Sequence, residues 1–185
     1  MKEQQKKYEL TDEFVVHWSG KKLYRIRALV SFGVVVAGQL GGFVESEKNL
    51  DQSLSGNAWV YGDALVYGDA LVYGDARVYG NAWVYGDARV YGNAEVYGDA
   101  RIRSYAVISE RKMIFGATNV GSENGTLTVF NGKDGLIVTR GCFTGTVDEF
   151  LSKSAEVHDD KTKNEYKLLI EVAKSRILGV KDERN

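Results

Sequence analysis

A six-residue unit repeats almost letter for letter through the middle of the chain, as in VYGDALVYGDALVYGDARVYG at residues 60–80. A period of six matches neither an α-helix nor a heptad, whereas it suits a short strand followed by a corner. Within each unit alanine and valine stand two positions apart, so both side chains point to one face of the strand. The Gly-Asp or Gly-Asn pair supplies the corner, because glycine adopts positive φ freely and Asp and Asn tolerate it. The repeat therefore predicts stacked short strands around a narrow core of alanine and valine.

The number of units in one turn follows from the residues that would stack. Three units per turn place each residue about 4.8 Å from the residue 18 positions later. Two corner columns then alternate Asn with Asp, which limits repulsion between carboxylates, and Arg77 lies beside Glu95. These columns are Asn57, Asp75, Asn93 and Asp63, Asn81, Asp99; the third, Asp69 and Asp87, pairs like charges. A 12-residue turn would stack more carboxylates, so we predict a three-sided coil that sets Val60 beside Val78.

The pattern V-Y-G-D-A-x resembles the hexapeptide repeat of left-handed parallel β-helix proteins. In that family an aliphatic residue and a small residue four positions later point inward, and Val60 with Ala64 matches this arrangement. The resemblance implies left-handed winding, although the usual rule for parallel crossovers favours the right-handed form. Tyrosine follows the aliphatic residue here, where the family has a small or acidic residue. We therefore expect outward columns of stacked tyrosines, one of them Tyr61, Tyr79 and Tyr97.

The resemblance and the flanking patterns together predict a mainly β fold, a left-handed parallel β-helix with three-sided, 18-residue coils, a C-terminal β-hairpin and a two-helix cap. We divide the chain into an N-terminal cap with an irregular first coil (1–55), the hexapeptide-repeat β-helix (56–120) and the C-terminal hairpin with its α-helical cap (121–185). Within these parts, the strand-like residues 23–45 are expected to form the irregular turn and SEKNLDQSLS (46–55) an exposed loop. Residues 101–117 are expected to continue the coil in degenerate form.

Two β-rich runs, 126–130 and 136–140, flank the turn cluster NGKDG and predict the hairpin. The sequence TVDE at 146–149 is typical of a capping box and predicts a helix of about a dozen residues. A last helix is expected near 163–178. Its apolar stripe consists of Tyr166, Leu169, Ile170, Ala173 and Ile177.

Several outward positions of the repeat carry large apolar side chains that should not all face water. They are Trp59, Leu65, Leu71 and Trp83. Either the N-terminal segment covers them within one chain, or chains meet there. Members of the resembled family are commonly trimers, so the resemblance implies a homotrimer or another homo-oligomer.

Charge and composition exclude several classes. The chain of 185 residues carries 24 Lys plus Arg and 25 Asp plus Glu, a balance that argues against a membrane-surface protein or a general nucleic-acid binder. Cys142 is the single cysteine, so an internal disulfide is impossible. No apolar run approaches the roughly 20 residues of a membrane span, and the N-terminus lacks the apolar core of a signal peptide. We expect a cytoplasmic protein.

Evidence for catalysis is sparse. The resemblance raises the possibility of an acyl-CoA-dependent acyltransferase, but such enzymes need a histidine base near a coil face. His17 and His158 both lie outside the repeat, and we interpret both as structural. Cys142 is interpreted as a small buried cysteine. We therefore lean against an enzyme and predict no catalytic residue, no cofactor and no metal site.

Two segments could bind an anion. In YRIR, Arg25 and Arg27 are expected on one face of a strand, next to Tyr24. The glycine-rich segments 121–126 and 139–146 offer backbone N–H groups, hydroxyls and one arginine, a combination that holds phosphate. The full set of candidate ligand-binding residues is Tyr24, Arg25, Arg27, Ser122, Asn124, Arg140 and Phe143.

The N-terminal LYRIRAL…GQLGGFVESEKNL, the repeat and the terminal NGTLTVF…VTRGCFTGTVDEFL together resemble hexapeptide-repeat proteins of phages and prophages. The first hypothesis is a non-enzymatic, phage-encoded binding protein, a counter-defence sponge that sequesters a small anionic nucleotide signal. The alternatives are the acyltransferase and a structural or assembly protein of a virion.

Overall fold

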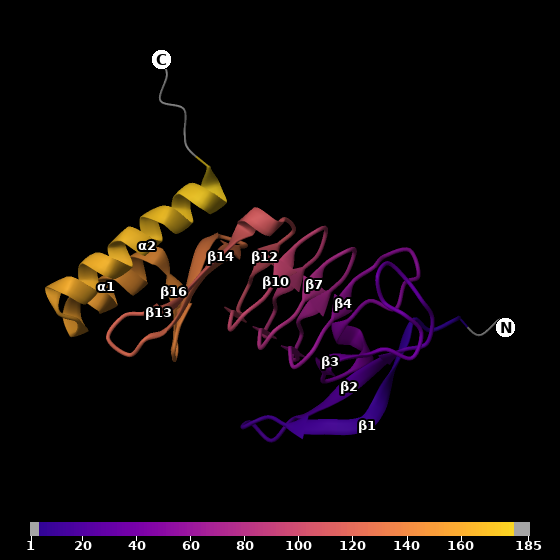
Figure 1. The fold of residues 1–185 in the computed structure, drawn as a ribbon. Helices are drawn as coiled ribbons and strands as arrows, with labels where there is room; N and C mark the ends of the chain where they lie inside the picture. Colours follow the sequence, from indigo (N-terminus) through magenta and orange to yellow (C-terminus); the bar gives the residue numbers. More distant parts are fainter. Residues whose placement is uncertain (1–3, 180–185) are drawn as a thin grey trace, which may run out of the picture.

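The computed structural model describes residues 4–179, in which a central parallel β-solenoid has one of its sheets extended by three N-terminal strands and is capped at its C-terminal end by a separate antiparallel sheet (Figure 1). The N-terminal cap has strands β1 (Tyr8–Val16), β2 (Lys22–Ala28) and β3 (Leu40–Val44), then the 3₁₀ turn η1 (Glu47–Asn49). The solenoid strands are β4 (Trp59–Val60), β5 (Leu65–Val66), β6 (Leu71–Val72), β7 (Arg77–Val78), β8 (Trp83–Val84), β9 (Arg89–Val90), β10 (Glu95–Val96), β11 (Arg101–Ile102) and β12 (Val107–Ile108). The C-terminal part has η2 (Arg111–Met113), β13 (Ile114–Val120), β14 (Gly125–Gly132), β15 (Gly135–Arg140), β16 (Phe143–Thr146), α1 (Val147–Val157) and α2 (Asp160–Leu178).

The solenoid confirms the three-sided coil of 18 residues. Its strands form three parallel stacks, β4–β7–β10, β6–β9–β12 and β5–β8–β11, in which Val60 pairs with Val78 and Leu65 with Trp83. The coils are joined by backbone hydrogen bonds, such as the one from Tyr61 N to the Val78 carbonyl oxygen at 2.8 Å. The alanines and aliphatic residues of the repeat fill the interior and are almost completely buried. The period of six thus sets both the triangular cross-section and its narrow core.

Tyrosine rings stack in pairs on the outside of the coil, and in the expected column of Tyr61, Tyr79 and Tyr97 it is Tyr79 that stacks on Tyr97, with ring centroids 5.8 Å apart. Tyr67 stacks on Tyr85 with ring centroids 4.9 Å apart, and Tyr73 stacks on Tyr91 at the same distance. The spacing is that of neighbouring strands, so equivalent rings of successive coils fall face to face. Burial raises the pKa of the Tyr67 hydroxyl and of the Tyr73 hydroxyl. These columns are therefore partly desolvated surface and not free side chains in water.

The corner columns also follow the predicted register. Asn57 donates from Nδ2 to Asp75 Oδ1 at 3.0 Å, so an amide and not a second carboxylate lies next to Asp75 in this column. In the column that pairs like charges, Lys48 from the N-terminal cap lies 3.0 Å from Asp69 and lowers the pKa of that carboxyl. Glu95 pairs in register with Arg77, but its ion pair at 2.7 Å is with Arg111.

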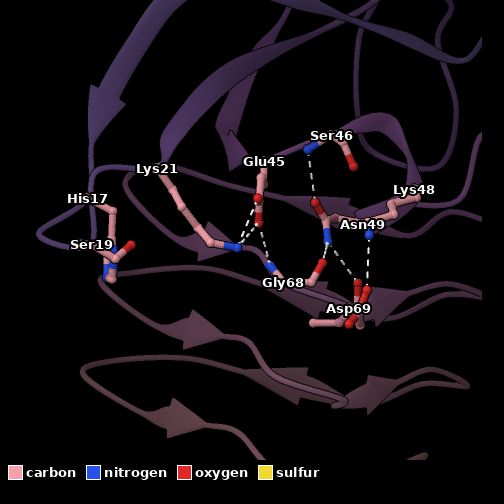
Figure 2. Close-up of polar contacts among 10 residues, drawn as sticks. His17, Ser19, Lys21, Glu45, Ser46, Lys48, Asn49, Gly68 and Asp69 are labelled. Carbon is pink, nitrogen blue, oxygen red and sulfur yellow. Dashed lines mark hydrogen bonds and ion pairs between the residues drawn. The ribbon is translucent and has the colours of Figure 1, made fainter.

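The interpretation of residues 46–55 as an exposed loop is wrong for its first half. Leu50 is buried and bridges Val72 in parallel, so this segment belongs to the first coil. Asn49 is also buried and donates to the carbonyl oxygens of Gly68 and Ala70, each at 3.0 Å (Figure 2). The polar residues of SEKNLDQSLS suggested a solvent-exposed segment. Instead, Asn49 forms hydrogen bonds with backbone groups at the edge of the coil.

The carboxylate of Glu45 also forms hydrogen bonds at this edge of the coil. Glu45 accepts hydrogen bonds from the Gly68 backbone N–H at 2.7 Å and from Lys21 Nζ at 3.0 Å (Figure 2). The strand pairs Val44–Val66 and Leu50–Val72 are offset by 22 residues, four more than in the regular coil. The N-terminal part thus supplies an irregular first coil, built by residues 40–50 rather than by the whole of 23–45.

The N-terminal segment also covers the first outward tryptophan. Trp59 is 0% exposed, and its ring meets Tyr8 at 6.0 Å and Phe32 at 5.4 Å between centroids. Lys7 is 0% exposed as well and donates from Nζ to the Ala58 carbonyl oxygen at 3.1 Å. Cover within one chain is therefore the correct alternative for Trp59.

At the other end, the predicted hairpin is present as β14 and β15 but is part of a larger sheet. Antiparallel β13–β14–β15–β16 closes the last coil, and Asn131 donates from Nδ2 to the Val107 carbonyl oxygen at 3.0 Å. The expectation that residues 101–117 all continue the coil is wrong from Ile114 onward, where the chain enters the antiparallel strand β13. Strand β14 is buried on both faces, because Phe130 packs in the solenoid core and Val129 in the core under the helices.

The helices form the outer layer of the C-terminal part (Figure 1). The capping box is confirmed: Thr146 Oγ1 accepts from Glu149 N at 3.2 Å, and Thr146 N donates to Glu149 Oε2 at 2.8 Å. Helix α2 buries the predicted stripe against the sheet, with Leu169 only partly buried. Within residues 4–179, no helix combines the length and apolarity needed to cross a membrane.

Candidate functional site

A cavity of about 340 Å³ lies between the turns of the C-terminal sheet and the two helices. The β13–β14 turn, the β15–β16 turn and the facing surfaces of α1 and α2 contribute to it. Its lining residues are Ser122, Glu123, Arg140, Gly141, Cys142, Phe143, Phe150, Lys153, Ser154, Val157, His158 and Tyr166. The volume falls at the lower end of the roughly 300–1,000 Å³ of small-molecule sites.

Arg140, the last residue of β15, is the half-buried cation of this cavity. Its Nε donates to the Tyr166 hydroxyl at 3.0 Å, and its guanidinium lies over Gly125, where an added Cβ would be 2.5 Å from Nη1. Within residues 4–179, no carboxylate comes within 4.0 Å of this guanidinium and Nη1 makes no hydrogen bond. Arg140 therefore has positive charge and donor capacity to offer to an anion.

Aromatic rings form the apolar wall of the cavity. Phe143 meets Phe150 edge-on with centroids 5.4 Å apart, and Phe150 meets Tyr166 at 5.0 Å. A planar ligand ring would find the same kind of contact there. Lys153 lines the cavity beside this wall and is exposed to solvent.

The cavity also contains an imidazole and a thiol. His158, the C-cap of α1, shares a 2.9 Å hydrogen bond between Nδ1 and Ser154 Oγ, and its ring lies 5.3 Å from Tyr166. The interpretation of Cys142 as a buried cysteine is wrong: it is free and exposed, in the turn between β15 and β16. Free cysteines are usually buried, but a tight turn leaves this side chain in solvent.

The structure brings together three of the seven predicted ligand-binding residues. Ser122, Arg140 and Phe143 line the one cavity, although 18 residues separate the first two in the sequence. Asn124 does not line it; this exposed residue has φ +49° and serves in the turn between β13 and β14.

The other three predicted residues lie at the opposite end of the molecule, on β2 (Figure 1). Arg25 Nε is 2.9 Å from Glu13 Oε1, and Arg27 is paired with Glu9. Tyr24 packs on Phe14 with ring centroids 6.0 Å apart. Because both arginines are neutralised by carboxylates from β1, this strand offers little surplus charge to an anion.

Sequence reasoning missed the residues that the helices contribute. Phe150, Ser154 and His158 are spaced four apart on α1, so they share one face of that helix and point at the sheet. The spacing was visible in the sequence. Which turn of the sheet that face would meet was not.

Fold and site together define a β-solenoid repeat protein with a ligand-sized cavity in its C-terminal cap. Among protein families, the YdcK beta solenoid repeat matches residues 58–74 and 70–86, so the central coils are similar to that repeat. The matching description names neither a hexapeptide repeat nor an acyltransferase. Comparison with curated proteins yields no match to the chain.

Proposed function

We propose that this protein is a non-enzymatic binding protein that holds a small anionic ligand with a planar ring, a nucleotide in the first instance, in the C-terminal cavity. The observation that carries the proposal is the state of Arg140. It is half-buried, it has no carboxylate within 4.0 Å in residues 4–179, and it shares a cavity with Lys153. An anion would supply the missing counter-charge, and the bond would be charge-assisted on both sides.

The aromatic wall supports the nucleotide in particular. A phosphate beside Arg140 and Lys153 leaves the rest of the ligand next to Phe143 and Phe150, where a base can stack. The Ser122 hydroxyl lies on the same cavity and provides a further hydrogen-bonding group. The resemblance to phage proteins extends the proposal to a counter-defence sponge that acts in the host cell cytosol, and to a homotrimer or other homo-oligomer.

The test is isothermal titration of the full chain with nucleoside monophosphates, cyclic nucleotides and ADP-ribose derivatives. We expect saturable binding of at least one of them, with an affinity that falls as salt is added. Arg140→Gln should weaken this binding about tenfold or more, because it removes the charge-assisted bond.

Two variants keep this test clear of folding artefacts. Lys153→Ala changes an exposed helix residue and should weaken binding without altering the unfolding midpoint. Arg27→Gln is the matched control, since it removes an equal charge at the other end of the molecule and should leave affinity unchanged. No heat with any nucleotide, or equal affinity in Arg140→Gln and Lys153→Ala, would reject the proposal.

The acyltransferase remains the second candidate because Cys142 and His158 line the same cavity. In the tautomer whose Nδ1–H donates to Ser154 Oγ, the Nε2 of His158 is the atom able to take a proton from an acceptor. This candidate predicts turnover of acetyl-CoA that is lost in His158→Ala, and absence of turnover in the parent chain excludes it. A virion role would instead be detected as the protein's presence in purified particles.

A further inference from the structure

A second cavity, of about 490 Å³, lies under the β1–β2 hairpin, where the hairpin runs along the outer face of the solenoid (Figure 1). It is separate from the C-terminal cavity and shares no residue with it. Its lining residues are Glu13, Val15, Val16, His17, Trp18, Arg25, Phe43, Asp63, Leu65 and Trp83. The volume accommodates a small polar ligand of one or two rings.

Two tryptophans contact His17 at this cavity, Trp18 of the hairpin turn and Trp83 of β8. His17 is 7% exposed and packs its ring on Trp18 at 5.1 Å, on Trp83 at 5.3 Å and on Tyr67 at 4.7 Å. The Nδ1 atom of His17 is 2.8 Å from Ser19 Oγ. Its Nε2 atom is buried and has no hydrogen-bond partner in residues 4–179. A ligand hydroxyl would satisfy this nitrogen.

Apart from its contact with His17, the Trp18 ring faces solvent. Its side chain is 85% exposed at the tip of the hairpin, beside the cavity it lines. A flat indole left in water next to a cavity is a stacking surface for a ligand. Trp83, which is half-buried, provides further aromatic surface within the same cavity.

The one arginine that lines this cavity already has partners. Arg25 is 2.9 Å from Glu13 Oε1 and 4.0 Å from Asp63 Oδ1, and its Nη1 donates to the Gly41 carbonyl oxygen at 2.8 Å. Its guanidinium also stacks on Phe43 at 4.3 Å. An anionic ligand would have to displace these partners, so the cavity does not favour an anion.

The cavity does not favour an organic cation either, because Glu13 already has its cation and Asp63 is largely exposed to solvent. What remains is hydrogen-bonding capacity at a lining with one arginine and two carboxylates. Both carboxylates have free oxygen lone pairs that can accept from hydroxyl groups. The neighbouring Arg101, which stacks on Trp83 at 4.2 Å, uses Nη1 on backbone carbonyl oxygens and does not line the cavity.

We infer that this cavity binds a neutral carbohydrate. One face of a pyranose ring carries C–H groups that pack on an indole, and its hydroxyls donate to carboxylates and accept from N–H groups. Trp18 and Trp83 match the first property, and Glu13, Asp63 and His17 match the second. The inference is independent of the nucleotide proposal, which concerns the other end of the molecule.

The test is titration of the full chain with neutral sugars: glucose, galactose, mannose, N-acetylglucosamine, maltose, cellobiose and lactose. Binding is followed by tryptophan fluorescence and by calorimetry. At least one sugar should bind saturably, with a Kd on the order of 1 mM or tighter. Trp18→Ala should weaken it about tenfold, and an exposed side chain of this kind can be removed without loss of the fold.

Phe14→Ala is the matched control, since Phe14 is a partly exposed aromatic residue on the same hairpin that does not line the cavity. Glu13→Gln and Arg140→Gln separate the two sites: the first should weaken sugar binding only, and the second nucleotide binding only. Saturable binding of no sugar in the panel overturns the inference. So does preferential binding of choline or of glucose 6-phosphate, or unchanged sugar affinity in Trp18→Ala.

Discussion

The close contact between successive coils predicts unequal effects of the same substitution at two equivalent corners. Gly80 has φ +69°, and a Cβ added there would lie 3.0 Å from Gly98 N and 3.1 Å from Gly98 O. Gly98 has φ +62°, and a Cβ added there would meet nothing within 4 Å. Gly80→Ala and Gly98→Ala therefore share the backbone strain but not the clash with the next coil.

The magnitudes follow from these contacts. A left-handed conformation costs an alanine roughly 1–2 kcal/mol, offset by about 0.4–1 kcal/mol from the less flexible unfolded chain. Gly98→Ala should therefore destabilise the fold by about 1 kcal/mol. Gly80→Ala should add roughly 1–3 kcal/mol of overpacking. The neighbour is backbone whose Gly98 carbonyl oxygen accepts from Asn81 N at 2.9 Å, so it has little room to move.

The assay is denaturant and thermal unfolding of both variants, followed by far-UV circular dichroism. For a chain of this size each 1 kcal/mol lowers the Tm by roughly 2–4 °C, so the two variants should be clearly separated. Equal losses in the two variants would refute the reasoning, because they would mean that successive coils do not press together at this corner.

Two further predictions concern pH. Because burial raises the pKa of Tyr67 and Tyr73 above 10.0, their contribution to stability is complete below pH 10 and is lost as the pH rises through their folded pKa values. Denaturant midpoints should fall above about pH 10, and Tyr67→Phe should reduce that fall; tyrosines that titrate normally at 295 nm would contradict this. Burial lowers the pKa of Lys7, so as the pH rises towards 10.5 the unfolded chain keeps a proton that the folded chain has lost, and the free energy of unfolding gains a rising contribution. Lys7→Met should remove that contribution, and an identical pH slope in the variant below pH 10 would disprove it.

The repeated part of the fold was predictable because the residues within each unit determine its local structure. Alternation of alanine and valine placed both side chains inside, and the Asn–Asp columns selected 18 residues per turn over 12. The capping box at Thr146 is equally local, since residues three apart satisfy each other's groups. In these cases the partners are close in sequence or related by the period.

The caps were less predictable because their partners have no such relation. The burial of Asn49 depends on the carbonyl oxygens of Gly68 and Ala70. The negative charge of Asp69 is likewise compensated by an ion pair with Lys48. Composition alone made the segment that holds Asn49 and Lys48 look like a loop. Only its position over the edge of the coil gives its polar groups partners.

The candidate site was likewise predictable in part: its residue types could be found in the sequence, but not their partners in space. Glycines, hydroxyls and arginines near the two turns were recognisable in the sequence, but Arg25, Arg27 and Arg140 looked alike there. Tertiary structure distinguished them, by setting Glu13 and Glu9 against the first two and the aromatic rings of α1 and α2 beside the third.

By itself, then, the sequence determined the solenoid: its period, its inward and outward faces and its tyrosine columns, since translation by 18 residues brings like residues together. Tertiary structure alone decided which charges are neutralised and which cavities remain open. Those outcomes depend on contacts between segments that no period relates, and electrostatic and packing energies act through distance in space rather than distance along the chain.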